Sequence, residues 1–450
     1  MRTRIVDRQS SPILALALVA AATLLALFLV AVAPAAAPAR AETLPPREWV
    51  LVANVDGQLS VVDTETDIVY GPFLSGTLGS EGGQLLDVAV TPDGDMALVS
   101  NFGDMVVSFV DVSDPMSPSF ISSTTIEMFA EDIDVDPHGQ FALVTDGGFS
   151  YEIDVIDLIS RTLAYTVPLP AFAAQAVEIA PDGTVIVVDY FASVVQSLYP
   201  DASGQLTVTG VYSFVITPEG TLSPTVALAP DRLPASARLS SETRPLAERE
   251  PLELNQAGEP IWPRPVNIGL APDNQTVIVG GVSPYGTPTE TLYALGVYQI
   301  ISPGSLTFTQ AITGLPRAVQ SVAFSADGKQ AYLNSNGGDA ASFDNWNRLM
   351  VLDILAPGRV SLNTTDAVDF PRLTTSQLFG VDTIAVANGK AYVSYPTLSG
   401  ALPDLRVVDL LNYSVKRLTM PGIPTGVDVI PVLRIYLPLV IRDTVLSPSP

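Results

Sequence analysis

The sequence predicts an all-β protein, a seven-bladed β-propeller of four-stranded antiparallel blades, and three observations lead to this prediction. A unit of two apolar strands joined by a tight turn recurs along the chain. No segment from residue 42 onward shows a helical period of 3.6 residues with caps. The last apolar strand of this kind, 425–431, matches a strand that is missing before residue 49.

The recurring unit has apolar residues two apart, a turn similar to Pro-Asp-Gly, and a second apolar strand, as in DVAVTPDGDMALVSN at 87–101. Period-two alternation with β-branched residues indicates strands, and Asp-Gly or Asn-Gly turns indicate antiparallel hairpins. Further copies lie at 132–146, 176–189, 267–281, 321–335 and 383–395.

Several units continue with a third strand that ends in Asp and a fourth strand rich in Thr, Val and Leu, such as TLAYTVPLP at 162–170. Four antiparallel strands in about 45 residues are typical of a propeller blade. Third strands are expected within 59–67, 106–114, 153–161, 349–357 and 405–413.

The first blade begins with its second strand, Trp49–Asn54, and lacks a first strand before it. Val427 and Val429 precede Pro431 by four and two residues, the spacing found before Pro92 in the unit at 87–101. Pairing of 425–431 with the first blade would close the ring and remove exposed strand edges. This gives seven first strands and therefore seven blades.

An eighth blade is the alternative, because the interval from Gly183 to Asn274 is close to two periods. Against it, residues 210–229 parallel 296–313 as the outer strands of an ordinary blade. The segment 231–265, rich in Pro, Arg and Glu, is expected to be a long insertion loop.

The repeat resembles a known family. WVLVANVDGQLSVVDTETDIV at 49–69 is similar to the repeat of the YVTN or YncE-like propellers, and VVSFVDVSDPMSPSFIS at 106–122 is similar to the LVIVD repeat. The resemblance covers nearly all of residues 47–431. It implies the fold more than the activity, because such propellers include lactonases, surface-layer proteins and many uncharacterised exported proteins.

The first 41 residues are expected to be an export signal. Three arginines precede the uncharged run 13–32, and small residues at Ala39 and Ala41 flank an expected cleavage point. Because the run has 20 residues, an uncleaved membrane anchor is the alternative. In both cases the body of the protein is expected outside the cytoplasm, secreted or associated with the cell surface.

Composition narrows the class of partner. The 450-residue chain is 47% apolar, which suits a large core, and it has no cysteine, which excludes disulfides, thiolate metal sites and cysteine nucleophiles. Removal of residues 1–41 takes away four Arg and one Asp and changes the net charge from −25 to −28. A nucleic-acid partner is therefore not expected, and contact with a membrane is expected only through the N-terminal run.

The departures from the repeat are expected on one face of the disc. They are the connections 231–265, 282–291, 336–348, 356–380 and 396–404. Trp262, Tyr285 and Trp346 lie in them, and exposed aromatic side chains can stack on a sugar or on an apolar patch of a partner. The alternative is that these side chains only fix the loops to the disc.

A second candidate site is the mouth of the central channel, where polar residues begin several inner strands: Asp87, Asp132, Asn267, Ser321 and Thr383. They could bind water, a cation or a polar ligand, or they could only satisfy backbone groups at strand ends. Another acidic set, Asp134, Glu178 and Asp428, lies two residues further along. No calcium-binding spacing is present, and neither a metal nor a cofactor is expected.

A binding or structural scaffold is the function that the sequence favours, with an unidentified protein, carbohydrate or small polar ligand as partner. The alternative is a lactonase-like hydrolase that uses carboxylates and Arg264, Arg317 or Arg348 near the loop face. The resemblance implies a site with His, Arg and Glu, but the one histidine, His138, lies in a turn on the opposite face. The tail 432–450 is either an extra strand along the first blade or a sorting signal.

Overall fold

The computed structural model divides the chain into two units, residues 1–45 and 46–450, and the second unit contains all the residues described here. Every regular element among them is a strand, and none of them forms a helix suited to crossing a membrane. The described residues are 47–79, 84–127, 129–147, 150–170, 174–189, 194–213, 264–282, 293–315, 318–337, 346–370, 383–394 and 403–431.

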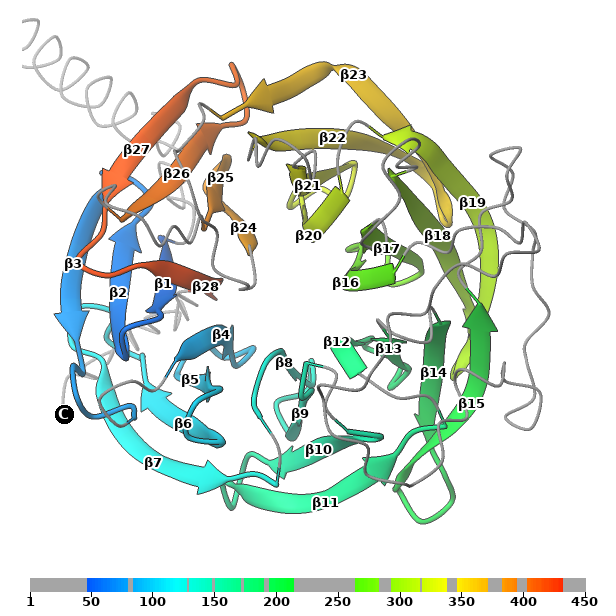
Figure 1. The fold of residues 1–450 in the computed structure, drawn as a ribbon, viewed down its shortest axis with the longest axis horizontal. Coiled ribbons are helices and arrows are strands. Elements are labelled where there is room, and N and C mark those ends of the chain that lie inside the picture. Colours follow the sequence, from blue (N-terminus) through cyan, green and yellow to red (C-terminus); the bar gives the residue numbers. More distant parts are fainter. Residues whose placement is uncertain are drawn as a thin grey trace, which may run out of the picture. The chain divides into compact units, whose positions relative to one another are not determined.

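The strands form seven four-stranded antiparallel sheets arranged as blades around a common axis (Figure 1). Blade 1 consists of β28 (Pro424–Pro431), β1 (Glu48–Asn54), β2 (Gln58–Asp63) and β3 (Ile68–Phe73). Blade 2 consists of β4 (Leu85–Val90), β5 (Met96–Asn101), β6 (Val106–Asp111) and β7 (Ser119–Thr125). Blade 3 consists of β8 (Ile133–Val135), β9 (Phe141–Val144), β10 (Glu152–Asp157) and β11 (Thr162–Pro168).

The remaining blades follow the same order from the inner to the outer strand. Blade 4 consists of β12 (Ala174–Ile179), β13 (Val185–Asp189), β14 (Val194–Pro200) and β15 (Leu206–Ser213). Blade 5 consists of β16 (Arg264–Leu270), β17 (Thr276–Val282), β18 (Tyr293–Ser302) and β19 (Ser305–Leu315). Blade 6 consists of β20 (Ala318–Phe324), β21 (Gln330–Gly337), β22 (Trp346–Ala356) and β23 (Arg359–Asp369), and blade 7 of β24 (Ile384–Ala387), β25 (Lys390–Val393), β26 (Asp404–Asp409) and β27 (Val415–Thr419).

The expected ring closure is confirmed. Strand β28 pairs antiparallel with β1, with Val429 opposite Val50 and Val427 opposite Val52. The C-terminal strand is therefore the innermost strand of blade 1, and the described residues form the predicted seven blades.

The core lies between the blades. Each of the seven junctions between neighbouring blades contains one cluster of buried apolar side chains. At the closing junction, Val50 and Val52 of blade 1 pack with Leu405 and Val407 of blade 7. Because the middle strands are covered on both faces, they are continuous apolar runs, whereas an outer strand such as β7 is largely exposed.

The prediction for the outer strands of blade 4 was wrong. Residues 210–229 were expected to form them, but the third and fourth strands are β14 and β15, which end at Ser213. The hairpin turns earlier because the Asp201 carboxylate accepts the N–H groups of Ser203 and Gln205, and Gly204 adopts a positive φ of 83°. Residues 214–263, which include most of the expected insertion loop 231–265, lie outside the described residues.

Two further boundaries differ from the prediction. The connection expected at 356–380 contains β23, which pairs with β22 along Arg359–Asp369. This strand is polar and mostly solvent-facing, so it lacks the apolar alternation that indicates a strand in sequence. Trp346 was expected in a loop but begins β22, opposite Gly337.

Candidate functional site

The inner strands bring polar residues from different blades to the axis of the ring. Strand direction alternates within a blade. The connections between the second and third strands and the connections between blades therefore lie on the same face of the ring, which we call the loop face. The Asp-Gly turns lie on the opposite face, the turn face. Among the five residues predicted for the channel mouth, Asp87, Asn267 and Ser321 lie within inner strands, and Asp132 and Thr383 directly precede them.

Asp87 and Asp132 each bind the backbone of the next blade. The Asp87 carboxylate of blade 2 accepts the N–H of Ile133 in blade 3 at 3.0 Å. In the same way the Asp132 carboxylate accepts the N–H of Val177 in blade 4 at 2.9 Å. Burial raises the pKa of Asp87, and the Asp132 carboxylate also lies near enough for its charge to raise it.

The second acidic set makes equivalent contacts. Asp428 of blade 1 accepts the N–H of Val90 in blade 2 at 2.7 Å, and Asp134 accepts the N–H of Ile179 in blade 4 at 2.6 Å. Glu178 of blade 4 accepts the N–H of Leu270 in blade 5. Five carboxylates thus connect the inner strands of blades 1 to 5. We call them the axial carboxylates: Asp87, Asp132, Asp134, Glu178 and Asp428.

Asp87 is buried, the other four axial carboxylates are half-buried, and the five lie close to one another; both conditions favour their neutral form. Burial, together with the charges of the neighbouring carboxylates, raises the pKa of Asp132 and of Asp134 to about 7. Burial raises the pKa of Asp428 to about 6. The pKa values of Asp87 and Glu178 are well above the ordinary range, first because of burial and then because of adjacent acidic groups.

In blades 5 to 7 the predicted channel-mouth residues are neutral, and their contacts differ from those of the axial carboxylates. The Oδ1 atom of Asn267 and the Oγ atom of Ser321 are buried and have no hydrogen-bond partner. Thr383 donates its hydroxyl to the carbonyl of Thr425 at 2.7 Å and so joins blade 7 to blade 1. At Gly426 an added Cβ would lie 2.6 Å from the Cα of Asp87, so glycine permits the close approach of β28 and β4.

The structure therefore assembles the predicted channel-mouth residues but gives Asp87, Asp132 and Thr383 clear structural roles. Ligand binding at these residues remains a prediction. The described residues contain no group of three or more acidic or histidine side chains arranged to hold a metal ion.

A second acidic group lies at the loop face of blade 3, and the sequence analysis did not identify it. Asp154 is only 5% exposed, and burial together with the charges of Glu152 and Glu127 raises its pKa to about 7. Glu131 accepts a hydrogen bond from Gln175, and burial raises its pKa to about 7 as well. An Asp in the middle of the apolar run of β10 was the available signal, because buried strand positions rarely carry a carboxylate.

The acidic residues are concentrated in one part of the ring. Residues 84–213, which contain blades 2 to 4, have 19 Asp and Glu but a single basic residue, Arg161, apart from His138, and their net charge is −18. The whole chain has a net charge of −25, so less than a third of the sequence accounts for most of the net negative charge. This asymmetry produces a strong local potential that attracts cations.

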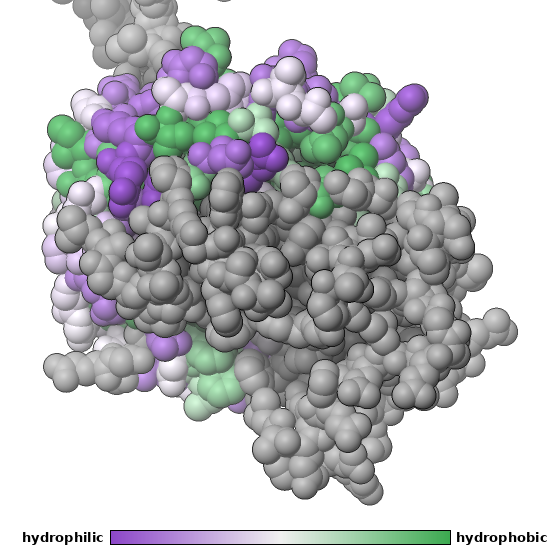
Figure 2. Space-filling view, turned by 45° about the horizontal axis from the view of Figure 1, so that its top comes forward, coloured by the Kyte–Doolittle hydropathy of each residue, from purple (hydrophilic) through white to green (hydrophobic). Residues whose placement is uncertain are grey.

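The predicted aromatic site on the loop face lies largely outside the described residues. Trp262 and Tyr285 both lie outside the described residues. For Trp346 the backbone position in β22 is described. Figure 2 shows apolar and polar residues interspersed over the described part of the surface.

Of the arginines expected near the loop face, Arg348 forms an ion pair with Asp369 at 2.9 Å. Arg264 begins β16, and Arg317 lies outside the described residues. The single histidine, His138, is in the expected turn on the turn face, where its Nδ1 atom lies 3.3 Å from Asp136. None of these contacts forms a catalytic pair.

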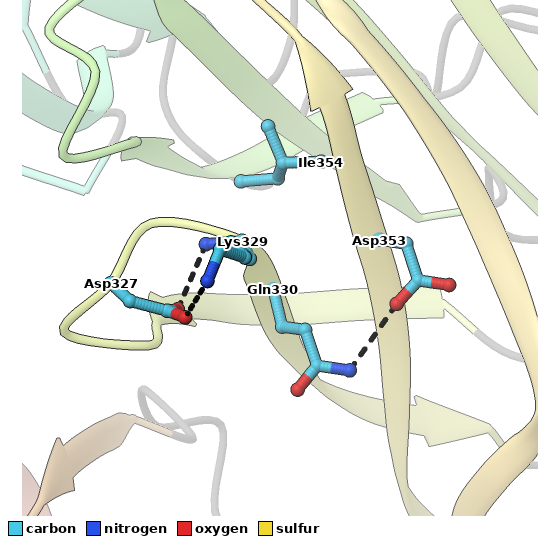
Figure 3. Close-up of a pocket in the computed structure, with 5 residues that line it drawn as sticks. All are labelled: Asp327, Lys329, Gln330, Asp353 and Ile354. Carbon is cyan, nitrogen blue, oxygen red and sulfur yellow. Dashed lines mark hydrogen bonds and ion pairs between the residues drawn. The ribbon is translucent and has the colours of Figure 1, made fainter.

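A depression of about 410 Å³ lies on the turn face of blade 6 (Figure 3). Lys329 bonds to Asp327, and Gln330 donates to Asp353 at 3.2 Å, while Ile354 forms the apolar wall. The polar groups therefore bind one another, and Lys329 and Asp327 are exposed.

Comparison with known proteins supports the fold. No family model and no curated protein matches the chain. A functionally unknown protein from Desulfotomaculum acetoxidans has a similar structure, with a TM-score of 0.61, 17% identity, and coverage of 85% of this chain and 98% of that one. A periplasmic gluconolactonase from Pseudomonas aeruginosa aligns with a TM-score of 0.55, 14% identity, and coverage of 86% and 99%.

A protein from Bacteroides fragilis, provisionally assigned as a 6-phosphogluconolactonase, aligns with a TM-score of 0.56, 9% identity, and coverage of 86% and 99%. At these identities the likeness concerns the fold: this chain is a seven-bladed propeller with lactonase-like structural neighbours.

Proposed function

We propose that this protein is an exported propeller of the YVTN or YncE-like kind, with some LVIVD character, that acts as a binding scaffold outside the cytoplasm for a positively charged partner. The observation that carries the proposal is the formal charge of −18 on residues 84–213, most of it on side chains other than the axial carboxylates, whose neutral form is favoured by burial and by their neighbours. Electrostatic attraction concentrates cationic groups at such a surface and repels nucleic acids and anionic lipids.

Three features support a scaffold. The ring is closed by β28 and has a continuous core, so it can hold a binding face rigidly. The contacts of Asp87, Asp132 and Asp134 fasten blades together and place no nucleophile beside a base. The periplasmic neighbour and the apolar run 13–32 agree with export.

Calorimetric titration of the mature chain, residues 42–450, tests the proposal with three probes: a lysine-rich peptide, an aspartate-rich peptide of equal length and a neutral oligosaccharide. We expect the lysine-rich peptide alone to bind, with an affinity that falls as salt rises because the attraction is screened. Equal binding of the aspartate-rich peptide, or no binding of the lysine-rich one, would contradict the proposal.

Lactone hydrolysis is the second candidate. The observation in its favour is the neighbouring pair of carboxyl groups of Asp87 and Asp132, whose pKa values are raised, because such a pair can act as acid and base. Turnover of sugar-derived or aliphatic lactones by the mature chain, unaffected by chelators and abolished by Asp132→Asn, would establish this activity. Such a result would replace the scaffold proposal.

A further inference from the structure

One edge of blade 2 on the turn face combines exposed apolar side chains with acidic ones. The carbonyl of Asp95, in the first turn of the blade, accepts the N–H of Val112 in the turn between β6 and β7 at 2.9 Å. The second turn presents Met116, and β7 then presents Phe120 and Ile121. These three side chains are 41%, 38% and 37% exposed. Met116 lies in the turn that leads to β7, and Phe120 and Ile121 lie near the start of β7; together with the first turn we call this surface the blade 2 strip.

Exposed apolar residues are more frequent in this blade than in any other described part of the ring. Ten large apolar residues among the described ones are exposed, and four of them, Met105, Met116, Phe120 and Ile121, belong to blade 2. Strand β7 is also an outer strand, so one of its edges has no neighbouring strand in its sheet. Single exposed apolar side chains need no explanation, but several beside a free edge indicate a contact surface.

The acidic residues of the strip have no basic partner among the residues that the structure describes. Asp93 accepts hydrogen bonds from Thr91 and from the N–H of Asp95, and Asp114 accepts the N–H of Met116. These bonds come from the neutral groups of their own turns. The strip therefore offers apolar contacts together with unneutralised negative charge.

The C-terminal segment starts at this strip. Strand β28 ends at Pro431, and an added Cβ at Gly94 would overlap the carbonyl oxygen of Pro431. The chain that follows therefore leaves the ring beside the first turn of blade 2. Residues 432–442, VLRIYLPLVIR, contain eight large apolar residues, two arginines and no acidic residue.

The segment is long enough to cover the strip. Neighbouring strands are about 4.8 Å apart, so a four-stranded blade is about 15 Å across. Eleven extended residues span up to about 36 Å. The apolar composition matches Met116, Phe120 and Ile121, and the positive charges of Arg434 and Arg442 match the acidic turns.

We propose that residues 432–442 dock across the blade 2 strip, from Gly94 to β7, and so form a cover for this edge of the ring. The apolar side chains of the segment contact Met116, Phe120 and Ile121, and its arginines neutralise the acidic turns. The acidic turns belong to residues 84–213 and so contribute to the charge on which the proposed function rests, but the tests below follow the segment itself and need no ligand.

Limited proteolysis of the full mature chain tests the proposal, because trypsin cleaves after Arg434 and Arg442. We expect slow cleavage at Arg434 in the native chain and at least a tenfold increase in Phe120→Ser/Ile121→Ser. The matched control is Leu411→Ser, which removes an exposed apolar side chain from blade 7 and should leave the rate unchanged. Equal rates in the native chain and the double variant would overturn the proposal.

Disulfide trapping provides a second measurement, which does not depend on the folding of the double variant. Because the chain has no cysteine, Met116→Cys/Leu437→Cys introduces a single pair. We expect an intramolecular disulfide in this variant and none in Leu411→Cys/Leu437→Cys. A disulfide formed only between two chains would overturn the proposal and show that a second copy supplies the segment.

Discussion

At the scale of single residues, the axial carboxylates show how one side chain can carry both a stabilising contact and an electrostatic cost. Asp87 accepts a backbone N–H from the next blade, which would otherwise be buried without a partner. Its own ionisation is unfavourable because it is 7% exposed and lies beside Asp132. The hydrogen bond requires an acceptor oxygen, but it does not require the charge.

Substitution of Asp87 separates these two contributions. Asp87→Asn keeps a carbonyl oxygen for the N–H of Ile133 and removes a charge, so we expect equal or greater stability at pH 8. Asp87→Ala leaves that N–H unsatisfied and should lower the free energy of unfolding by about 1 to 3 kcal/mol. Urea denaturation at pH 8 measures both effects, and equal losses in the two variants would show that the charge itself is needed.

At the scale of elements, the blades are joined by contacts that repeat from one junction to the next. The Thr184 hydroxyl of blade 4 accepts the N–H of Gly304 in blade 5 at 2.7 Å, and the Thr276 hydroxyl of blade 5 accepts the N–H of Gly358 in blade 6 at 2.8 Å. Both glycines have positive φ, and an added Cβ at Gly304 would meet Tyr199 at 2.7 Å. The turns between the outer strands of blades 5 and 6 therefore fasten each of these two blades to its predecessor.

Strand β28 is the element on which ring closure depends. Truncation after residue 424 removes the partner of β1 and exposes Val50 and Val52 at the junction with blade 7, so we expect cooperative loss of the whole ring. Truncation after residue 445 keeps β28 and the segment 432–442, and we expect no change. Differential scanning calorimetry distinguishes the two variants. A ring that melts normally without 425–431 would show that the closing strand is dispensable.

At the scale of the whole molecule, the distribution of charge makes stability depend on pH. The raised pKa values of Asp132, Asp134, Glu131 and Asp154, about 7 in each case, mean that the folded protein binds more protons than the unfolded chain near pH 6. This stabilising contribution is fully present below about pH 4, where the unfolded chain is protonated too, and it is lost as the pH rises from about 4 to about 7. An ion-paired carboxylate has the opposite effect at lower pH. Lys390 and Lys416 lower the pKa of Asp67, so its contribution to stability is lost as the pH falls.

We therefore expect maximum stability near pH 4, about the ordinary pKa of a carboxyl group. Each unit of pKa shift corresponds to about 1.4 kcal/mol, so the free energy of unfolding should fall by at least a few kcal/mol between pH 5.5 and pH 8. Denaturation at both pH values measures the change, and Asp132→Asn should reduce it. A stability that rises from pH 5.5 to pH 8 would contradict the assignment of raised pKa values.

The outer strands show where sequence information was insufficient. The middle strands are apolar on both faces, and their runs and Asp-Gly turns located every blade. In contrast, β15 and β23 were misplaced, because an outer strand packs on one side only and tolerates Thr, Asn and Asp. The sequence analysis noted the second acidic set but could not assign its contacts. Each partner belongs to a neighbouring blade and lies at least 45 residues away along the chain.

The repeat, the seven blades and closure by the final strand were determined by the sequence itself, because alternation, turn residues and buried runs are local properties that identical units share. Only the tertiary structure decided that five carboxylates from blades 1 to 4 bind backbone groups of the following blades. The physical reason is distance along the chain. Asp428 and Val90 are 338 residues apart, and their hydrogen bond and the burial that raises the pKa of Asp428 exist only when the ring has closed.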